Sequence, residues 1–186
     1  MRRASNEVVD ELLVLRCREG DRRALTALVE RWQERLWRHA RRMTGHDDLA
    51  YDAVQDTWMA AGRGIVSLAD AGAFRTWIFT ILARAATSRL RERRLGGHDL
   101  PEAEAVPSAT PVRSPRERAL AEALDELDDD ARVLLSLHHV EGFGVRDLST
   151  ILGVPTGTVK SRLHDARLAL KQALERIERR HEEETR

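Results

Sequence analysis

Cysteine is almost absent from this 186-residue chain, since Cys17 is the single one. An intramolecular disulfide is therefore excluded, as is a zinc site built from several cysteines, and a reducing compartment fits the composition. Long hydrophobic runs are missing too. No stretch approaches the roughly 18 apolar residues of a membrane span, and the N-terminus lacks the apolar core of a signal peptide. These absences predict a cytoplasmic protein without membrane insertion.

An excess of charge of one sign is also missing, because 31 basic and 31 acidic residues balance. The charges are unevenly distributed, however. Residues 1–94 carry 18 basic and 13 acidic side chains, a net charge of +5, whereas residues 115–186 carry 12 and 15, a net charge of −3. The overall charge therefore says nothing about nucleic-acid binding, which has to be judged from individual helices.

The chain has no constellation of residues typical of an enzyme. We find no nucleophile beside a base, no carboxylate pair suited to acid–base work and no glycine-rich phosphate loop. His138 and His139 are adjacent, and neighbouring side chains on a helix diverge by about 100°, which is poor geometry for chelating a metal. We therefore expect no catalytic residue, no metal and no cofactor.

Apolar residues recur at helical spacing along almost the whole chain, and aromatic and β-branched residues never alternate at the period of a strand. The predicted fold class is all-α. Asp21 is placed to cap one of the expected helices and Gly45 to end it. Helices are expected from Val8 to near Gly20 and at residues 21–45, 47–61 and 74–95, with a turn or loop at 62–72. The side chains expected in this core are Leu25, Leu28, Val29, Trp32, Leu36, Ala50, Ala53, Val54, Thr57, Trp58, Phe74, Trp77, Ile78, Ile81, Leu82 and Ala85.

The composition changes at residue 96. Up to residue 114 the chain is rich in proline, alanine, serine and glutamate, with prolines spaced so that no helix can persist. We therefore predict two small helical domains, at 1–95 and 115–186, joined by a flexible linker at 96–114. Ser114, Pro115 and Glu117 supply the cap, the first-turn proline and the acid of a capping box at the start of the second domain. Its expected core contains Leu120, Ala123, Leu124, Leu127, Val133, Leu134 and Leu137.

A helix-turn-helix pattern follows in the second domain. A short helix at 145–152 and a longer helix from Thr156 flank the turn Gly153-Val154-Pro155. The longer helix should bury Val159, Leu163, Ala166, Leu170, Leu174 and Ile177. Its opposite face carries donors suited to base edges and phosphates, although an ordinary solvated face would also fit. The exposed side chains expected there are Lys160, Ser161, His164, Asp165, Leu168 and Lys171.

The residues around that turn, GVPTGTVKSRLH at 153–164, closely resemble the region 4 signature of extracytoplasmic-function sigma factors of the sigma-70 superfamily. LDDDARVLL at 127–135 and VEGF at 140–143 resemble the segment that precedes this signature. In the first half, DLAYDAVQDTW at 48–58 and AFRTWI at 73–78 resemble region 2. The resemblance covers most of residues 21–178. It implies a factor that directs bacterial RNA polymerase to specific promoters, helps open them, and responds to stress or another signal.

The same resemblance implies three binding surfaces and two protein partners. Core polymerase, through its β′ and β subunits, is expected to bind the acidic strip, which is Asp48, Asp52, Gln55 and Asp56. Acids near a helix start could instead act only on the helix dipole. The residues implied in minus-10 promoter DNA are Ser67, Asp70, Arg75, Arg84, Arg89 and Arg91. Those implied in minus-35 DNA are Arg146, Thr158, Lys160, Ser161, Arg162, His164, Asp165 and Lys171. An anti-sigma factor that masks these surfaces is the second expected partner.

Several positions depart from the family pattern. Asp165 replaces a residue that is commonly Arg, and Gly144-Val145-Arg146 replaces a more usual Ser-Tyr-Glu. Arg84 and Ser88 stand where Asn and Asp are frequent. Asp165 cannot donate to a phosphate or to guanine, although it could accept from cytosine N4 or pair with Arg162. No promoter sequence is therefore predicted.

Alternative interpretations remain for some residues and for the function. Phe74 and Trp77 are expected to pack in the core rather than stack on DNA bases. The linker acids Asp99, Glu102 and Glu104 fit a segment threaded through the polymerase and fit a solvated spacer equally well. The chain could also be a stand-alone helix-turn-helix regulator that does not use core polymerase, or an interaction module that titrates another regulator. The acidic strip favours polymerase binding, because a plain repressor has no use for it.

Overall fold

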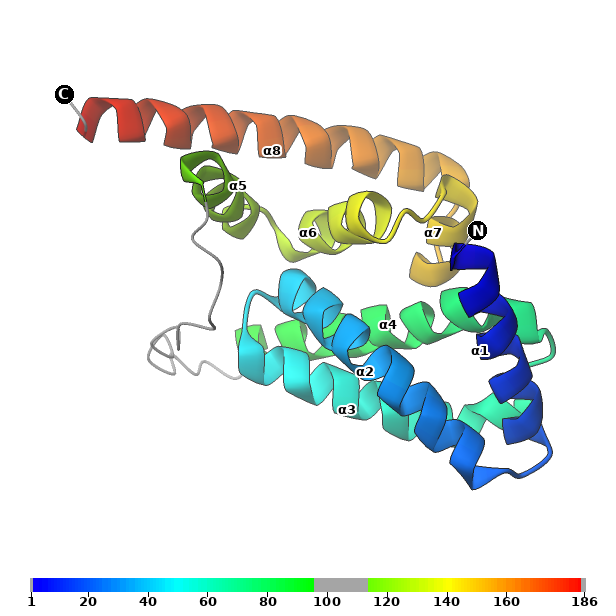
Figure 1. Ribbon diagram of the computed structural model, residues 1–186. Coiled ribbons are helices and arrows are strands. Elements are labelled where there is room, and N and C mark those ends of the chain that lie inside the picture. The colour runs from blue at the N-terminus through cyan, green and yellow to red at the C-terminus, as the bar shows by residue number, and fades with distance from the viewer. Residues whose placement is uncertain (1, 96–113, 185–186) are drawn as a thin grey trace.

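The computed structural model describes residues 2–95 and 114–184, so all but the last residue of the predicted linker lies outside the described residues. Every element in these two ranges is helical, which confirms the all-α fold class (Figure 1). Within the same ranges no helix is both long and apolar enough to cross a membrane. The first domain contains α1 (Arg2–Arg18), α2 (Arg22–Thr44), α3 (Asp47–Gly64), η1 (Ile65–Ser67), η2 (Ala71–Ala73) and α4 (Phe74–Leu95). The second contains α5 (Pro115–Asp125), α6 (Asp129–Leu135), the π-helical turn η3 (Ser136–Val140), α7 (Val145–Leu152) and α8 (Thr156–Glu184).

Local capping signals begin and end helices where the sequence predicts. The Asp21 carboxylate accepts a hydrogen bond from the backbone N–H of Arg23 at 2.8 Å, and Gly45 ends α2 in the left-handed conformation with φ of 75°. Ser114 and Glu117 form the predicted capping box at the start of α5. These ends depend only on near neighbours in sequence, which is why they can be predicted.

The loop predicted at 62–72 is wrong in most of its length. Helix α3 continues to Gly64 and is followed directly by η1, so that only residues 68–70 separate the helical segments before η2. The extension lets Ile65 reach the core, where it is almost fully buried. Burial of this side chain stabilises the extra turn in spite of Gly62 and Gly64.

Small side chains line the contacts among α2, α3 and α4. A methyl group is all that each alanine places between two helix backbones, so the helices can approach closely and still fill the space. Larger residues, including Leu28, Leu36 and Ile78, complete the core around them. We call the buried alanines the alanine seam, which consists of Ala40, Ala50, Ala53, Ala61, Ala83 and Ala86.

One prediction about core residues is wrong, and one core residue was missed. Leu120 is 41% exposed, and the face of α5 that packs on α8 carries Ala123, as expected, and Ala119, which was not expected there. Phe79 was not expected in the core, yet it is fully buried. The core faces of α5 and α4 are both determined by helices distant in sequence, so local periodicity misplaced Leu120 and missed Phe79. Others of the expected core side chains are half-buried rather than buried, namely Leu25, Val29, Trp58, Trp77, Ile81, Ala85, Leu124, Leu170 and Leu174.

The second domain packs against the first, with α7 lying on α4 and α6 on α2 (Figure 1). One continuous hydrophobic cluster contains buried residues of both domains. On the second-domain side it includes Phe143, Leu148 and Ile151, all of which are nearly inaccessible to solvent. A separate small cluster joins α5 to the far end of α8 through Ala123, Ala173 and Ile177 and their neighbours.

Candidate functional site

Helix α3 displays the acidic strip on the face opposite the alanine seam. Asp48 and Gln55 are exposed, while Asp52 is half-buried at the helix surface. Within the described residues no ion pair engages Asp48 or Asp52. These carboxylates are therefore available to a cationic partner, at a place held firmly by the buried side of the same helix.

Asp56, the last acid of the strip, is already engaged. Both Nε and Nη2 of Arg89 on α4 donate to its Oδ2, at 2.9 and 2.5 Å. This hydrogen-bonded carboxylate raises the pKa of the Arg89 guanidinium above its usual value. A residue assigned to polymerase binding and one assigned to minus-10 DNA thus hold each other, which the sequence did not indicate.

The other residues assigned to minus-10 DNA lie along the η1–η2 segment and α4. The Ser67 hydroxyl donates to the carbonyl of Gly64 at 2.8 Å, and Asp70 accepts from the backbone N–H of Gly72 at 2.9 Å, so both stabilise the turn between α3 and α4. Arg84 and Arg91 are exposed on α4 and can reach a phosphate backbone. Phe74 at the start of α4 belongs to the core, as expected, with its ring centroid 5.5 Å from that of Trp32, and Trp77 is half-buried and packs against the core.

The helix-turn-helix is formed by α7, the Gly153 turn and α8. Gly153 has φ of 67°, a conformation that favours glycine, and the Ser149 hydroxyl donates to the carbonyl of Val154 at 2.6 Å across the turn. Val159 and Leu163 bury the inner face of α8 against α6 and α7. These contacts orient the opposite face of α8 outward.

Polar side chains cover that outer face near the start of α8. The Ser161 hydroxyl donates to the Thr158 carbonyl at 3.1 Å, and Lys171 lies 3.7 Å from Glu175 one turn further along. The exposed members of the predicted minus-35 set are Arg146, Lys160, Ser161, Arg162, His164, Asp165 and Lys171, and Thr158 is half-buried. The six side chains that the helical wheel predicts to point outward are all exposed, namely Lys160, Ser161, His164, Asp165, Leu168 and Lys171.

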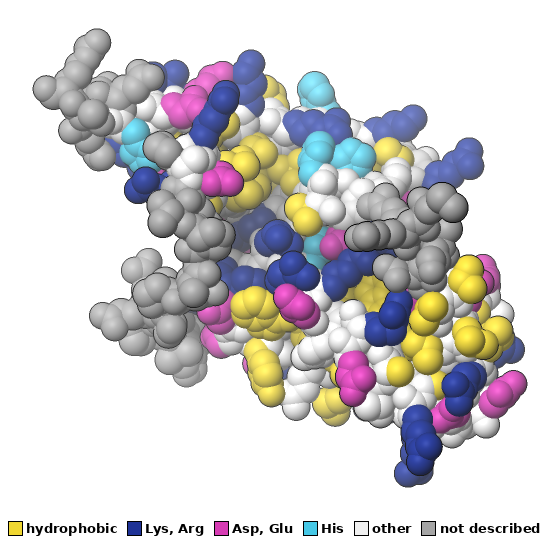
Figure 2. Space-filling view, viewed as in Figure 1, with side chains coloured by type: hydrophobic (Ala, Val, Ile, Leu, Met, Phe, Trp, Pro, Cys, Tyr) yellow, Lys and Arg dark blue, Asp and Glu magenta, His cyan; other side chains and the backbone are white. Residues whose placement is uncertain are grey.

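A cleft of about 620 Å³ separates α4 from α6 and α8. Arg91 and Arg94 line it from the first domain, and Arg162 and Asp165 line it from the second. Figure 2 shows Lys and Arg side chains gathered around the hollow between the two domains. Residues assigned to the two promoter elements therefore face the same narrow space in this arrangement.

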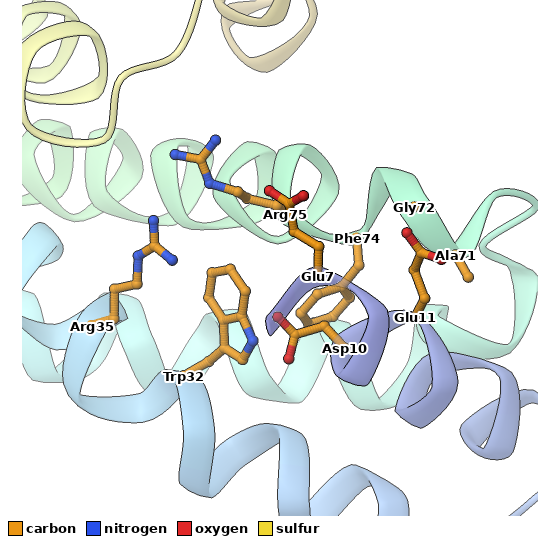
Figure 3. A pocket seen from close by; sticks show the side chains of 9 residues that line it. All are labelled: Glu7, Asp10, Glu11, Trp32, Arg35, Ala71, Gly72, Phe74 and Arg75. Atoms are coloured by element: carbon orange, nitrogen blue, oxygen red, sulfur yellow. The ribbon is translucent and has the colours of Figure 1, made fainter. Parts of the chain in front are cut away.

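A smaller hollow of about 110 Å³ lies between α1, α2 and the start of α4. Figure 3 shows carboxylates from α1 and guanidinium groups from α2 and α4 placed around Trp32 and Phe74. Asp10 is mostly buried there and accepts from Nε of Arg31 at 3.0 Å. Because α1 also packs on η1 and η2, this helix supports the segment assigned to minus-10 DNA, a role that sequence reasoning missed.

A polar cluster joins the two domains around Glu141. This carboxylate follows η3 in the second domain, and the guanidinium groups of Arg35 and Arg75 reach it from the first. His39 of α2 lies beneath, with Nδ1 3.6 Å from Oε1 of Glu141. Nothing in the local sequence pattern indicated this cluster. Among the described residues no group of three His, Cys, Asp or Glu side chains is arranged to hold a metal ion.

Comparison with known protein families matches both halves of the chain. The Sigma-70 region 2 model matches residues 28–95, and the Sigma-70 region 4 model matches residues 117–170. The two matches coincide with the domain that carries the acidic strip and the domain that carries the helix-turn-helix. They define the protein class as a sigma-70 type factor.

Known proteins that are similar along almost the full length of the chain identify the group within this class. The RNA polymerase sigma-H factor of Pseudomonas aeruginosa is 30% identical over 182 residues, covering 89% of this chain and 94% of the relative. The ECF RNA polymerase sigma-E factor of Haemophilus influenzae is 27% identical over 186 residues, covering 92% and 98%. The sigma factor RpoE of Bartonella quintana, solved in complex with the anti-sigma factor NepR, has a TM-score of 0.65 and 29% identity over 81% of this chain and 96% of its own. The chain belongs to the extracytoplasmic-function group of sigma-70 family RNA polymerase sigma factors.

Proposed function

We propose that the first domain, residues 1–95, binds core RNA polymerase through its β′ and β subunits and helps open the minus-10 element. Residues 115–186 bind the minus-35 duplex, and residues 96–114 connect the two domains. The polymerase performs the catalysis, so the factor itself needs no catalytic residue or cofactor. The observation that carries the proposal is the pairing, in one chain of this family, of an exposed acidic strip on α3 with an exposed polar face on α8.

An anti-sigma factor is the regulatory partner that we propose in addition. Support comes from the Bartonella quintana relative, whose structure contains the anti-sigma factor NepR. Such a partner would control when the factor reaches polymerase in response to a signal. Because polymerase and promoter DNA are its other partners, the proposed place of action is the cytoplasm.

The function is tested by mixing the purified chain with sigma-free bacterial core polymerase. We expect the chain to co-migrate with the core in gel filtration and to support initiation from specific fragments of a genomic library. Those fragments would also reveal the promoter sequence. Binding of duplex DNA without association with core would instead support the stand-alone helix-turn-helix regulator. A chain that binds neither core polymerase nor duplex DNA would support the interaction module.

Replacing Lys160 and Ser161 together by alanine should weaken binding of the minus-35 duplex by about 10- to 100-fold, because a phosphate contact and a base-edge donor are removed. The slope of log affinity against log salt should fall by about 1 for the lost lysine. Fluorescence anisotropy at several salt concentrations measures both. Association with core polymerase should be unchanged. Arg179→Ala, at the far end of α8, is the matched control, and an equal loss in that variant would contradict the assignment.

A further inference from the structure

Glu141 is a second-domain carboxylate that is buried by the first domain. Only 6% of its side chain is exposed. Arg35 of α2 donates to its Oε2 through Nε at 3.0 Å and Nη2 at 2.5 Å. Nη2 of Arg75 on α4 lies 3.5 Å from the same oxygen and donates to the backbone carbonyl of Glu141. A buried carboxylate held by two arginines from the other domain is strongly oriented, since removing either side leaves charge buried without its partner.

The same segment inserts an aromatic ring into the first domain. Phe143 is buried with its centroid 5.2 Å from that of Phe79, and the Arg75 guanidinium carbon lies 4.1 Å above the Phe143 ring. The π-helical turn η3 leads directly into Glu141, and Gly142, with φ of 72°, turns the backbone between Glu141 and Phe143. Glu141 and Phe143 therefore point into one site on α2 and α4, with the carboxylate and the ring on either side of Arg75.

A second ion pair lies at the other end of the domain contact. Nη2 of Arg94 near the end of α4 is 2.6 Å from Oδ2 of Asp129 at the start of α6. The pairing thus matches cations on the first domain with acids on the second at two separate points. Phe143, Leu148 and Ile151 add an apolar part to the same domain contact, so the ion pairs orient the two domains and salt weakens only their share of the contact.

This closed arrangement obstructs part of each proposed DNA surface, while Lys160, Ser161 and Lys171 stay exposed. Arg75 of the minus-10 set is occupied by Glu141 and Phe143. Arg91 of that set faces Arg162 and Asp165 of the minus-35 set across a cleft of about 620 Å³. That volume is typical of a small-molecule pocket and is far too small for duplex DNA. Arg75 is released from Glu141 and Phe143, and Arg91, Arg162 and Asp165 from the shared cleft, only when the domains separate.

We propose that Glu141, held by Arg35 and Arg75, is a latch that keeps the free factor closed, and that the latch must open before the factor binds promoter DNA. The first half of this proposal concerns the domain arrangement alone. The second half rests on the proposed function. Core polymerase would then act partly by selecting the open form, since a ligand shifts an equilibrium toward the state that it binds better.

Small-angle scattering of the full chain tests the latch without any DNA. We expect a wild-type radius of gyration close to the value of about 16 Å for compact chains of this length, and a value above about 20 Å for Glu141→Gln. Glu126→Gln is the matched control, because Glu126 pairs with Arg176 at 2.8 Å inside the second domain. It should stay as compact as the wild type. Far-UV circular dichroism verifies that each variant keeps its helices.

Arg35→Gln removes a first-domain partner of Glu141 and should open the chain as well. A wild type that is already extended, or compact Glu141→Gln and Arg35→Gln variants, would overturn the latch. Promoter fragments recovered in the transcription experiment then test the second half. Glu141→Gln should bind the minus-35 duplex about tenfold more tightly than the wild type in the absence of polymerase. An opened variant with unchanged DNA affinity would overturn the block on DNA while leaving the sigma function intact.

Discussion

Reversing the charge of Asp52 to arginine should lower the affinity of the factor for core polymerase by about 100-fold. The carboxylate lies in the middle of the acidic strip and has no ion-pair partner among the described residues, so an arginine there would face the cations of the partner directly. Like charges placed against each other at an interface cost several kcal/mol, and about 2.7 kcal/mol corresponds to this factor. Competition between the variant and a labelled wild-type chain for core polymerase measures the effect.

Asp52 is a better target than Asp56 for this experiment. Asp56→Arg would also break the pair with Arg89 and place two arginines against each other between α3 and α4, so a loss of binding could reflect a loss of folding. Glu178→Arg makes the same charge change on exposed α8 and should bind core normally. If Asp52→Arg bound core as well as the wild type while keeping its melting temperature, polymerase would have to dock elsewhere.

The stability of the fold should fall by about 3 kcal/mol between pH 6.5 and pH 4 because of His39 alone. Its ring is completely inaccessible to solvent, packs edge-on against Phe79 at 5.0 Å, and has no hydrogen-bond partner for either nitrogen among the described residues. Burial lowers the pKa of His39 to about 4. Arg42, Arg35 and Arg75 act in the same direction, and the neighbouring Glu141 opposes them.

The sign follows from the protons bound in each state. An unfolded chain binds a proton at His39 near the ordinary pKa of about 6.5, whereas the folded chain keeps the ring neutral until about pH 4. Stability is therefore fully present above pH 6.5 and is lost as the pH falls toward 4. Arg35 and its neighbours outweigh the effect of burial and hold the pKa of Glu141 below its usual 4.5, so this carboxylate contributes to the loss only at the acid end.

Denaturant unfolding of the wild type and His39→Met from pH 7.5 to pH 4.5 measures this contribution. The variant should show a flatter dependence, and the difference between the two curves isolates His39 from His46 and His139, whose pKa values are also lowered by burial. His164→Gln, on the exposed face of α8, should follow the wild type. Parallel curves for the wild type and His39→Met would show that the buried imidazole does not control acid stability.

Features decided by near neighbours could be predicted from the sequence. The cap at Asp21, the glycine end at Gly45 and the exposed face of α8 all follow from residue type and from helical periodicity. The orientation of the acidic strip follows in the same way, because Ala50 and Val54 mark the buried side of α3. The role of these surfaces in binding remains a prediction.

Features decided by the contact between the domains could not be predicted. Phe79 packs on Phe143, 64 positions away in the chain, as well as on Trp32 and His39, and no local pattern on α4 reveals these contacts. From the sequence alone Glu141 would be taken for an ordinary surface acid, because charged residues are rarely buried without partners. Its partners, Arg35 and Arg75, belong to α2 and α4 and are distant in sequence. Arg75 is engaged by the second domain in the same way, whereas Arg89 pairs with Asp56 inside the first domain. Neither pairing leaves a mark on sequence spacing, because each joins different helices.

The alanine seam has a consequence for the entropy of the polymerase binding that we propose for α3. Buried alanines have no side-chain rotamers to lose, and they hold α3 against α2 and α4 at close range. The acidic strip therefore has its backbone geometry before it meets a partner, and docking has to restrict only a few surface rotamers. Ordering side chains and loops on binding costs free energy, which lowers the affinity obtained from a given buried area. A rigid helix avoids most of this cost, so a modest number of charges on it can suffice for tight association.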